Sequence, residues 1–175
     1  MTAYREKYKD HRIGILDKIK PLQSDLILCL PMFSKDVNTS AILRSAHIFG
    51  VRKIYLAGNE DIISRQTSGT SHWLDYKRVN TYEELFDLLP EEHPIIVADS
   101  HGATLIYDFQ WPTNPILFLG RENGIPKIVL KNVNDHYQIK IPQFGLCESL
   151  NVGVAAGIML FHHRMQFDKS AVPIQ

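Results

Sequence analysis

Five short runs of apolar residues recur along the chain, and their length and spacing strongly constrain its fold. They cover residues 25–30, 51–57, 94–98, 115–119 and 137–141. Each run is too short for a core helix, and those at 25–30, 94–98 and 115–119 are almost continuously apolar, which is typical of a strand buried on both faces. Helical patterns lie between them, at 39–49 and from Thr81, where Glu84 completes a capping box. This alternation predicts an α/β fold with a mostly parallel sheet and helices on both faces.

The chain shows no internal repeat and no linker. Its 175 residues predict one domain spanning 1–175, with a basic N-terminal helix within 1–20 that ends before Pro21 and a main body at 26–161. We expect Pro31 to stop the first strand. The chain has 19 basic and 19 acidic residues, so its net charge is zero, which argues against a protein that coats nucleic acid without specificity.

The composition also bears on location and on metal binding. The sequence shows no apolar run long enough to cross a bilayer and no signal-peptide pattern, so we expect a cytoplasmic protein with no membrane partner. Cys29 and Cys147 lie far apart within apolar runs, so we expect both to be buried free thiols. His162 and His163 are adjacent and would point to different faces of a helix; we therefore predict no metal site.

The last apolar stretch, 139–161, reads as a strand, a turn and a helix that is apolar almost all round. We expect the helix to begin near Glu148 and Ser149. Gly153 and Gly157 leave a flat stripe on it, where another backbone can approach closely, and we expect part of this helix to be buried in a dimer. Asn151 is the one strongly polar side chain in its first turn, and a buried amide there must bond a loop, a ligand or a catalytic group.

Polar, glycine-bearing loops follow three of the predicted strands. They cover 98–102, 120–126 and 142–151. In parallel α/β sheets, ligands bind beyond the carboxyl ends of strands, so these loops mark the expected site. The phosphate-loop and dinucleotide-binding glycine patterns are both missing from the sequence, which weighs against a kinase, an NTPase or a nicotinamide enzyme. The sequence has no G-x-S-x-G either, so Ser149 is a poor hydrolase nucleophile.

Three segments in order resemble the motifs of the SpoU/TrmH family, the knotted SPOUT-superfamily RNA ribose 2′-O-methyltransferases. The segments are Asn38-x-Ser40-Ala41-Ile42-Leu43-Arg44, then Leu119-Gly120-Arg121-Glu122-Asn123-Gly124-Ile125-Pro126, then Ile141-Pro142 with Glu148-Ser149-Leu150-Asn151-Val152. The stretch from Ser68 to Leu74 also looks like a conserved segment of the family. The similarity runs from Leu26 to Phe161, almost the whole chain.

This resemblance implies a homodimeric enzyme with a C-terminal trefoil knot and S-adenosyl-L-methionine (AdoMet) as cofactor. It places the cofactor against backbone groups near Ala98, Gly120, Ile141 and Leu150. The acceptor would be RNA. We favour tRNA over rRNA, because the N-terminal segment is basic and no separate RNA-binding domain is visible.

The resemblance also implies five residues of the catalytic site: Arg44, Asn38, Glu122, Ser149 and Asn151. A guanidinium is never deprotonated in proteins, so we interpret Arg44 as a stabiliser of the developing alkoxide and a clamp on a phosphate. Its alternative role is a surface salt bridge. Asn38 can equally be a helix N-cap, and Glu122 can be structural. Ser149 and Asn151 match residues that shape the site.

The sequence departs from the family pattern at two places. Ser40 replaces the usual glycine, and Gly124 follows Glu122 by two residues where many relatives have three. Because the second motif touches the cofactor, one alternative is a non-catalytic RNA-binding protein of the same fold. A methyltransferase with a non-RNA acceptor is the other alternative. The sequence does not name the nucleotide modified, nor does it tell whether the N-terminal helix contacts RNA or the dimer partner.

Overall fold

A computed structural model describes residues 24–31, 33, 36–51, 53–58, 74–121, 124–133 and 137–167. The predicted N-terminal helix, Glu122 and the Ser68–Trp73 segment therefore lie outside the described residues. The described strands are β1 (Ile27–Pro31), β2 (Lys53–Ala57), β3 (Asp75–Val79), β4 (Ile95–Ala98), β5 (Thr104–Leu105), β6 (Ile116–Leu119) and β7 (Gln138–Lys140). The helices are α2 (Asp36–Ile48), α3 (Tyr82–Leu88), α4 (Lys127–Leu130) and α5 (Val152–Phe167), with a 3-10 turn at Ile106–Asp108.

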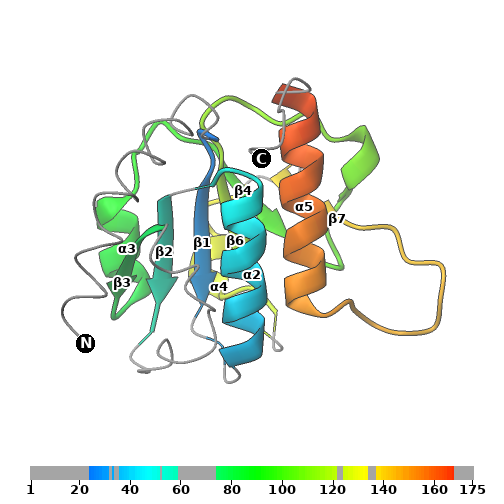
Figure 1. Cartoon of the computed structure of the whole chain (residues 1–175), viewed down its shortest axis with the longest axis horizontal. Helices are drawn as coiled ribbons and strands as arrows, with labels where there is room; N and C mark the ends of the chain where they lie inside the picture. Colours follow the sequence, from blue (N-terminus) through cyan, green and yellow to red (C-terminus); the bar gives the residue numbers. More distant parts are fainter. Residues whose placement is uncertain are drawn as a thin grey trace, which may run out of the picture.

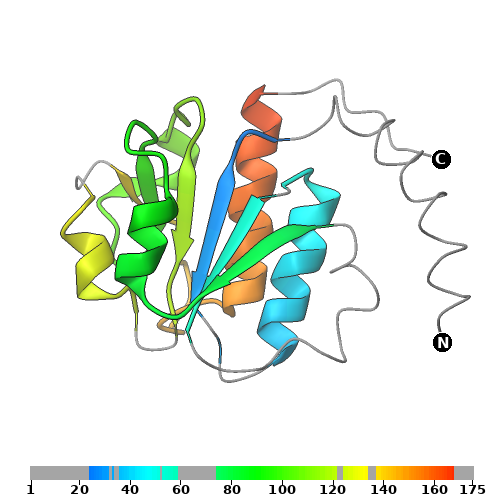
Figure 2. The same cartoon turned by 90° about the vertical axis from the view of Figure 1, so that its left-hand side faces the viewer.

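The strands form one sheet in the order β3-β2-β1-β6-β4-β7-β5, and every strand pair in it is parallel. Helices α2 and α5 lie side by side on one face of the sheet, with α3 and α4 on the other (Figures 1 and 2). The α/β class and the helices on both faces, predicted from the apolar runs, are thus confirmed.

Each face of the sheet has its own core because side chains alternate along a strand. In β1, Leu28 and Leu30 pack with α2 and α5 side chains such as Ile42 and Leu160. Ile27 and Cys29 of the same strand point to the opposite core, which contains α3 and α4 side chains. All five residues of β1 are buried, as a central strand requires.

The structure corrects several boundaries. Pro31 is the last residue of β1 rather than its stop, and α2 begins at Asp36, so Asn38 lies inside the helix and is not its N-cap. Helix α5 begins at Val152, after Glu148 and Ser149. The predicted cap at Thr81 is confirmed: its Oγ1 accepts a hydrogen bond from the Glu84 N–H at 3.1 Å.

Gly153 and Gly157 pack against α2 of the same chain, so the close approach predicted at this stripe is made within the chain. A methyl group added at Gly153 would lie 3.1 Å from the Ala41 Cβ, and one at Gly157 would lie 3.7 Å from the Ser45 Oγ. The stripe therefore serves close helix packing, as two glycines four residues apart permit. None of the described helices is long and apolar enough to cross a membrane.

Candidate active site

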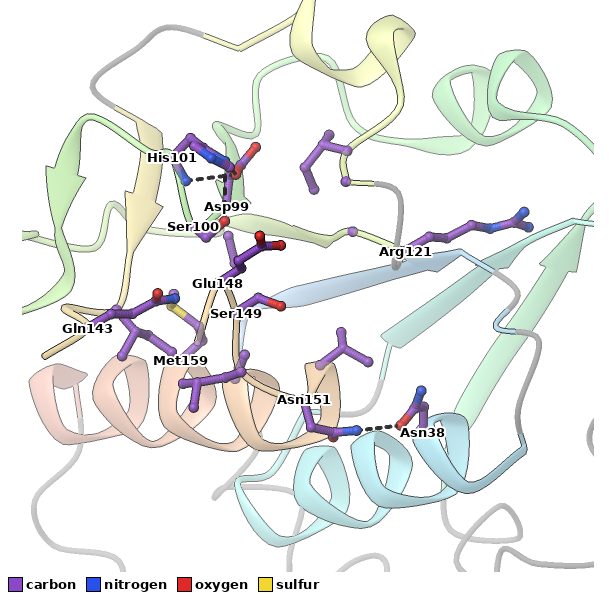
Figure 3. A pocket seen from close by; sticks show the side chains of 18 residues that line it. Asn38, Asp99, Ser100, His101, Arg121, Gln143, Glu148, Ser149, Asn151 and Met159 are labelled. Atoms are coloured by element: carbon purple, nitrogen blue, oxygen red, sulfur yellow. Dashed lines mark hydrogen bonds and ion pairs between the residues drawn. The ribbon is translucent and has the colours of Figure 1, made fainter. Parts of the chain in front are cut away.

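A cavity of about 740 Å³ lies at the carboxyl ends of β4, β6 and β7, which are neighbours in the sheet (Figure 3). The loops after these strands and the first turns of α2 and α5 form its wall. The lining residues are Asn38, Ala98, Asp99, Ser100, His101, Gly120, Arg121, Gly124, Ile125, Ile141, Gln143, Glu148, Ser149, Leu150, Asn151, Val152, Ala155 and Met159. Its position and size are those of a pre-formed small-molecule site.

Two glycines hold this wall in place. At Gly102 a Cβ would come within 2.5 Å of the Gln138 carbonyl oxygen, so only glycine lets the loop after β4 approach β7 so closely. Gly124 has φ of +86°, and its N–H donates to the Arg121 carbonyl at 2.9 Å while the Arg121 N–H donates back at 3.1 Å. This tight turn after β6 carries the second motif into the cavity.

The loop after β4 brings a carboxylate to one end of the cavity. The Asp99 Oδ1 accepts from the His101 N–H at 2.9 Å, and the His101 Nδ1 lies 3.4 Å from the same oxygen. The Ser100 Oγ lies 3.2 Å from the His101 Nδ1. Glu148 faces this group from the loop before α5 (Figure 3), so two carboxylates line one part of the wall.

An amide pair joins α2 to the start of α5. The Asn151 Oδ1 accepts from the Gly153 N–H at 2.8 Å, so Asn151 is the N-cap of α5. This bond fixes the orientation of the amide, and the Asn151 Nδ2 donates to the Asn38 Oδ1 at 3.0 Å (Figure 3). Asn38 lines the cavity and is only 8% exposed. Because its Oδ1 accepts from Asn151, its Nδ2 is the polar group of this amide that remains available as a donor.

The structure places most of the predicted site residues together. Ala98, Gly120, Ile141 and Leu150, the predicted cofactor-binding residues, all line the cavity, as do Asn38, Ser149 and Asn151. Asn151 bonds another side chain as predicted, although it is exposed rather than buried. Whether these residues bind and catalyse as predicted stays a prediction.

Arg44 is not among the lining residues. It lies six residues after Asn38 on α2. This separation is about 9 Å along the helix axis, and the two side chains point in directions that differ by about 120° around it. Its side chain is exposed, and the described residues provide it with no ion-pair partner, so the salt bridge weighed as its alternative role is not found there. One chain therefore does not bring Arg44 to the cavity.

Sequence reasoning missed Asp99, His101, Arg121, Gln143 and Glu148 as individual lining residues. All five belong to loops that the sequence marked as ligand-binding, and Arg121 and Glu148 stand within the quoted motif segments, but none of the five was named as a site residue. Cys147 lies in the last of these loops and is exposed, so its predicted burial is wrong, whereas Cys29 is buried as predicted. Burial strongly raises the pKa of Cys29. Both thiols are free.

The two adjacent histidines lie at the other end of α5. The His162 Nδ1 accepts from the Trp111 Nε1–H at 2.9 Å, while His163 is buried 3.6 Å from an Asp25 oxygen. Burial lowers the pKa of His163 to about 4. No cluster of metal-ligating side chains occurs within the part of the chain that the structure describes.

The fold of this chain is similar to that of solved methyltransferases. The SpoU methyltransferase AviRb from Streptomyces viridochromogenes, solved in complex with AdoMet, superimposes with a TM-score of 0.70 at 26% identity, over 86% of this chain and 64% of AviRb.

Sequence comparison agrees with the fold. This chain is 31% identical to the tRNA (guanosine(18)-2′-O)-methyltransferase of Thermus thermophilus over 170 residues, 93% of this chain and 86% of that protein. It is 30% identical to the 23S rRNA (guanosine-2′-O-)-methyltransferase RlmB of Coxiella burnetii, covering 90% of this chain and 66% of RlmB. The chain thus spans about two thirds of the length of RlmB and of AviRb.

Residues 25–161 match the SpoU rRNA methylase family, and the chain belongs to that family. The family predicted from the three motifs is confirmed, and with it the class of enzyme, an RNA methyltransferase.

Proposed function

We propose that this chain is an AdoMet-dependent enzyme that methylates a ribose 2′-hydroxyl of RNA, with tRNA as the favoured substrate. The observation that carries the proposal is the cavity itself. The three motif-bearing segments converge on one space, and the four residues predicted to hold the cofactor lie on its wall.

The lining of the cavity suits AdoMet. When bound, AdoMet supplies a methyl group made electrophilic by its sulfonium charge. Ile125, Ile141, Leu150 and Met159 offer apolar surface for an adenine ring, and Asp99 is one of two carboxylates that can face the cationic part of the cofactor. The second motif, although one residue short, still forms a closed turn through Arg121 and Gly124. This turn weighs against the non-catalytic alternative.

The amide pair would orient the acceptor ribose. Because the Asn38 Oδ1 is taken by Asn151, the Asn38 Nδ2 is the group left to donate to a substrate oxygen. Ser149 adds a hydroxyl to the same wall. Methyl transfer to a hydroxyl is an in-line displacement, so such positioning supplies much of the rate. Glu122 would support the turn of the second motif.

Arg44 would reach the reaction from a second copy of the chain. Exposed α2 side chains at Val37 (58%), Arg44 and Ile48 (67%) follow the helical spacing of one face. Helix α5 lies beside α2 (Figure 1) and exposes Val154, Phe161 and Met165 along its own outer face. We call these six residues the outer face.

A homodimer formed through the outer face would cover this apolar surface. It would also bring Arg44 of one chain close to the partner. There the guanidinium would stabilise the alkoxide that forms as the ribose hydroxyl loses its proton, and would hold the adjacent phosphate.

Complementation between two inactive variants tests this arrangement. Arg44→Ala leaves the cavity intact, and Asn38→Ala leaves Arg44 intact. If Arg44 acts on the partner's cavity, each mixed dimer has one complete site out of two. Random mixing of equal amounts makes about half of the dimers mixed, so about one quarter of the wild-type sites are restored. If Arg44 acts within its own chain, mixing restores none. A monomer in sedimentation at micromolar concentration would contradict the dimer itself.

The tRNA preference rests on the basic N-terminal segment and on the similarity to the Thermus tRNA methyltransferase. The trefoil knot and a cytoplasmic location belong to the same proposal.

Incubating the enzyme with total RNA and AdoMet labelled at its methyl group, followed by nucleoside analysis, tests the function as a whole. We expect a 2′-O-methylated nucleoside in the tRNA fraction. Label in rRNA would correct the substrate, and RNA binding without label would favour the non-catalytic alternative. Label in protein or a small molecule would change the acceptor.

A further inference from the structure

A second, smaller cavity of about 240 Å³ lies at the carboxyl ends of β2 and β3, next to the turn after β6. Ala57, Gly58, Asn80, Tyr82, Arg121 and Pro126 line it. It shares Arg121 with the cavity of the candidate active site and lies at the same edge of the sheet. Because the two cavities are adjacent, a macromolecular substrate bound at the first cavity can also contact the second.

The side chain of Arg121 belongs to this second cavity. In Figure 3 it extends away from Asp99 and Glu148, toward the ends of β2 and β3. The turn between Arg121 and Gly124 fixes its backbone. Among the described residues the guanidinium has no ion-pair partner, and none of those lining this cavity is a carboxylate, although the Glu84 Oε2 accepts from the backbone N–H of the lining residue Asn80 at 2.9 Å. A cation that no described acid neutralises favours an anionic ligand.

Tyr82 gives independent support. Its hydroxyl oxygen is buried and has no hydrogen-bond partner among the described residues. A buried hydroxyl without a partner is costly, and such groups often mark a place where a ligand supplies the missing bond. Tyr82 and Arg121 line the same cavity, and burial raises the pKa of Tyr82 while the Arg121 guanidinium lowers it. Asn80 is exposed on the cavity wall and adds an amide donor.

We propose that this second cavity binds a backbone phosphate of the RNA substrate beside the target nucleotide, with Arg121 as the anchor and Asn80 and Tyr82 as further donors. The proposal rests on the proposed function, in which RNA is the polyanionic substrate that approaches this edge of the sheet. A guanidinium is well suited to phosphate because its planar fork matches two phosphate oxygens.

The test measures binding of an unmodified tRNA transcript by the full chain, using fluorescence anisotropy over a range of salt concentrations. Arg121→Gln should weaken binding by about tenfold, the scale of a lost bond to a charged group. It should also reduce the slope of log affinity against log salt by a little under one, as expected for one phosphate contact. Arg121→Lys should recover most of that slope, because an ammonium keeps the point charge. AdoMet affinity, measured by calorimetry, reports separately how far the substitution also disturbs the first cavity, which Arg121 lines as well.

Two further variants locate the phosphate. Tyr82→Phe removes only the hydroxyl, and should weaken binding by about three- to tenfold without changing the salt slope. Lys131→Gln is the matched control: it removes an exposed positive charge from a residue that lines neither cavity. We expect it to change affinity and slope less than Arg121→Gln does.

Four outcomes would overturn the proposal. An unchanged slope in Arg121→Gln, or an equal change in Lys131→Gln, would show that no particular phosphate sits at Arg121. Unchanged binding by Tyr82→Phe would place the phosphate outside the cavity. Binding of a polyglutamate peptide that depends on Arg121 as strongly as tRNA binding does would assign the cavity to acidic protein. Failure of the wild-type chain to bind or methylate any RNA would instead reject the proposed function, so the two failures are distinguishable.

Discussion

Replacement of Asn151 separates its two roles, because each atom of its amide does a different task. The Oδ1 caps α5 through the Gly153 N–H at 2.8 Å, and the Nδ2 donates to the Asn38 Oδ1 at 3.0 Å. Asn151→Ala removes both bonds. Asn151→Asp keeps the oxygen that caps the helix and removes only the donor. The two variants should therefore differ in stability but share a loss of activity.

The expected changes in stability follow from these bonds. Loss of an N-cap costs about 1 kcal/mol, and loss of one side-chain hydrogen bond costs about 0.5–1.5 kcal/mol. Asn151→Ala should thus lose about 1–3 kcal/mol, which lowers the melting temperature of a chain of 175 residues by roughly 2–12 °C. In Asn151→Asp the cap remains, and a negative charge at the helix N-terminus adds about 0.3–1 kcal/mol, so its net change should be close to zero.

The expected loss of activity comes from Asn38. An aspartate at 151 has only oxygens, so the Asn38 amide must turn over and donate its Nδ2 to that carboxylate. Asn38 then presents an oxygen, not a donor, to the cavity. Misplacing a positioning group in this way costs on the order of 10²-fold in rate. Asn151→Asp should accordingly be a stable protein with about 1% of the wild-type single-turnover rate.

Thermal melts and single-turnover methylation of RNA with saturating AdoMet measure the two effects. Asn132→Asp is a matched control, because the Asn132 Nδ2 also donates one hydrogen bond, to the Ile128 carbonyl at 2.8 Å, but lies outside the cavity. We expect it to keep its rate. A stable Asn151→Asp with the wild-type rate would refute the role given to the Asn38 amide. An Asn151→Asp as unstable as Asn151→Ala would refute the capping account.

Three other predictions concern single side chains. Arg44→Ala and Arg44→Lys should each lower the single-turnover rate by about 10²-fold or more at unchanged AdoMet affinity, since lysine lacks the planar fork; a near wild-type rate in Arg44→Ala would exclude its role. Burial lowers the pKa of His163 from 6.5 to about 4, so the folded chain keeps it neutral where the unfolded chain protonates it. The free energy of unfolding should therefore fall by up to about 3 kcal/mol as the pH drops from 6.5 to 4, and urea titrations of the wild type and His163→Gln should diverge over that range. Cys147 should react quickly with a thiol reagent and Cys29 only after unfolding, because Cys147 is exposed and Cys29 is buried with a raised pKa; two fast thiols per folded chain would contradict this.

The central strands could be predicted from the sequence because burial on both faces makes them continuously apolar. The runs at 94–98 and 115–119 correspond to β4 and β6 within a residue at each end. The edge strands were missed for the opposite reason. β3, Asp75–Val79, has polar residues at exposed positions and only Val79 fully buried, and β5 has two residues. A strand with one solvated face carries no continuous apolar run.

The candidate site was predictable as a set of loops and only partly as a set of contacts. Loops after parallel strands meet at one edge, so 98–102, 120–126 and 142–151 could be grouped from the order of the strands alone. The bond between Asn38 and Asn151 joins residues 113 apart in the sequence, and no local pattern contains it. The start of α5 was misplaced because serine and asparagine are both good N-caps, and both Ser149 and Asn151 precede the apolar run.

The glycine stripe on α5 shows how one feature can support two different interfaces. Gly153 and Gly157 indicate that a backbone or small side chain packs closely, but not whether it belongs to the same chain. The structure assigns that partner to Ala41 and Ser45 of α2. Once the inner faces of α2 and α5 are used against each other, a dimer contact has only their outer faces left. Arg44 lies on that outer face and outside its own cavity. Intrachain packing of the stripe is therefore consistent with the proposed action of Arg44 on a partner, because the same helix pairing leaves Arg44 on the outer face.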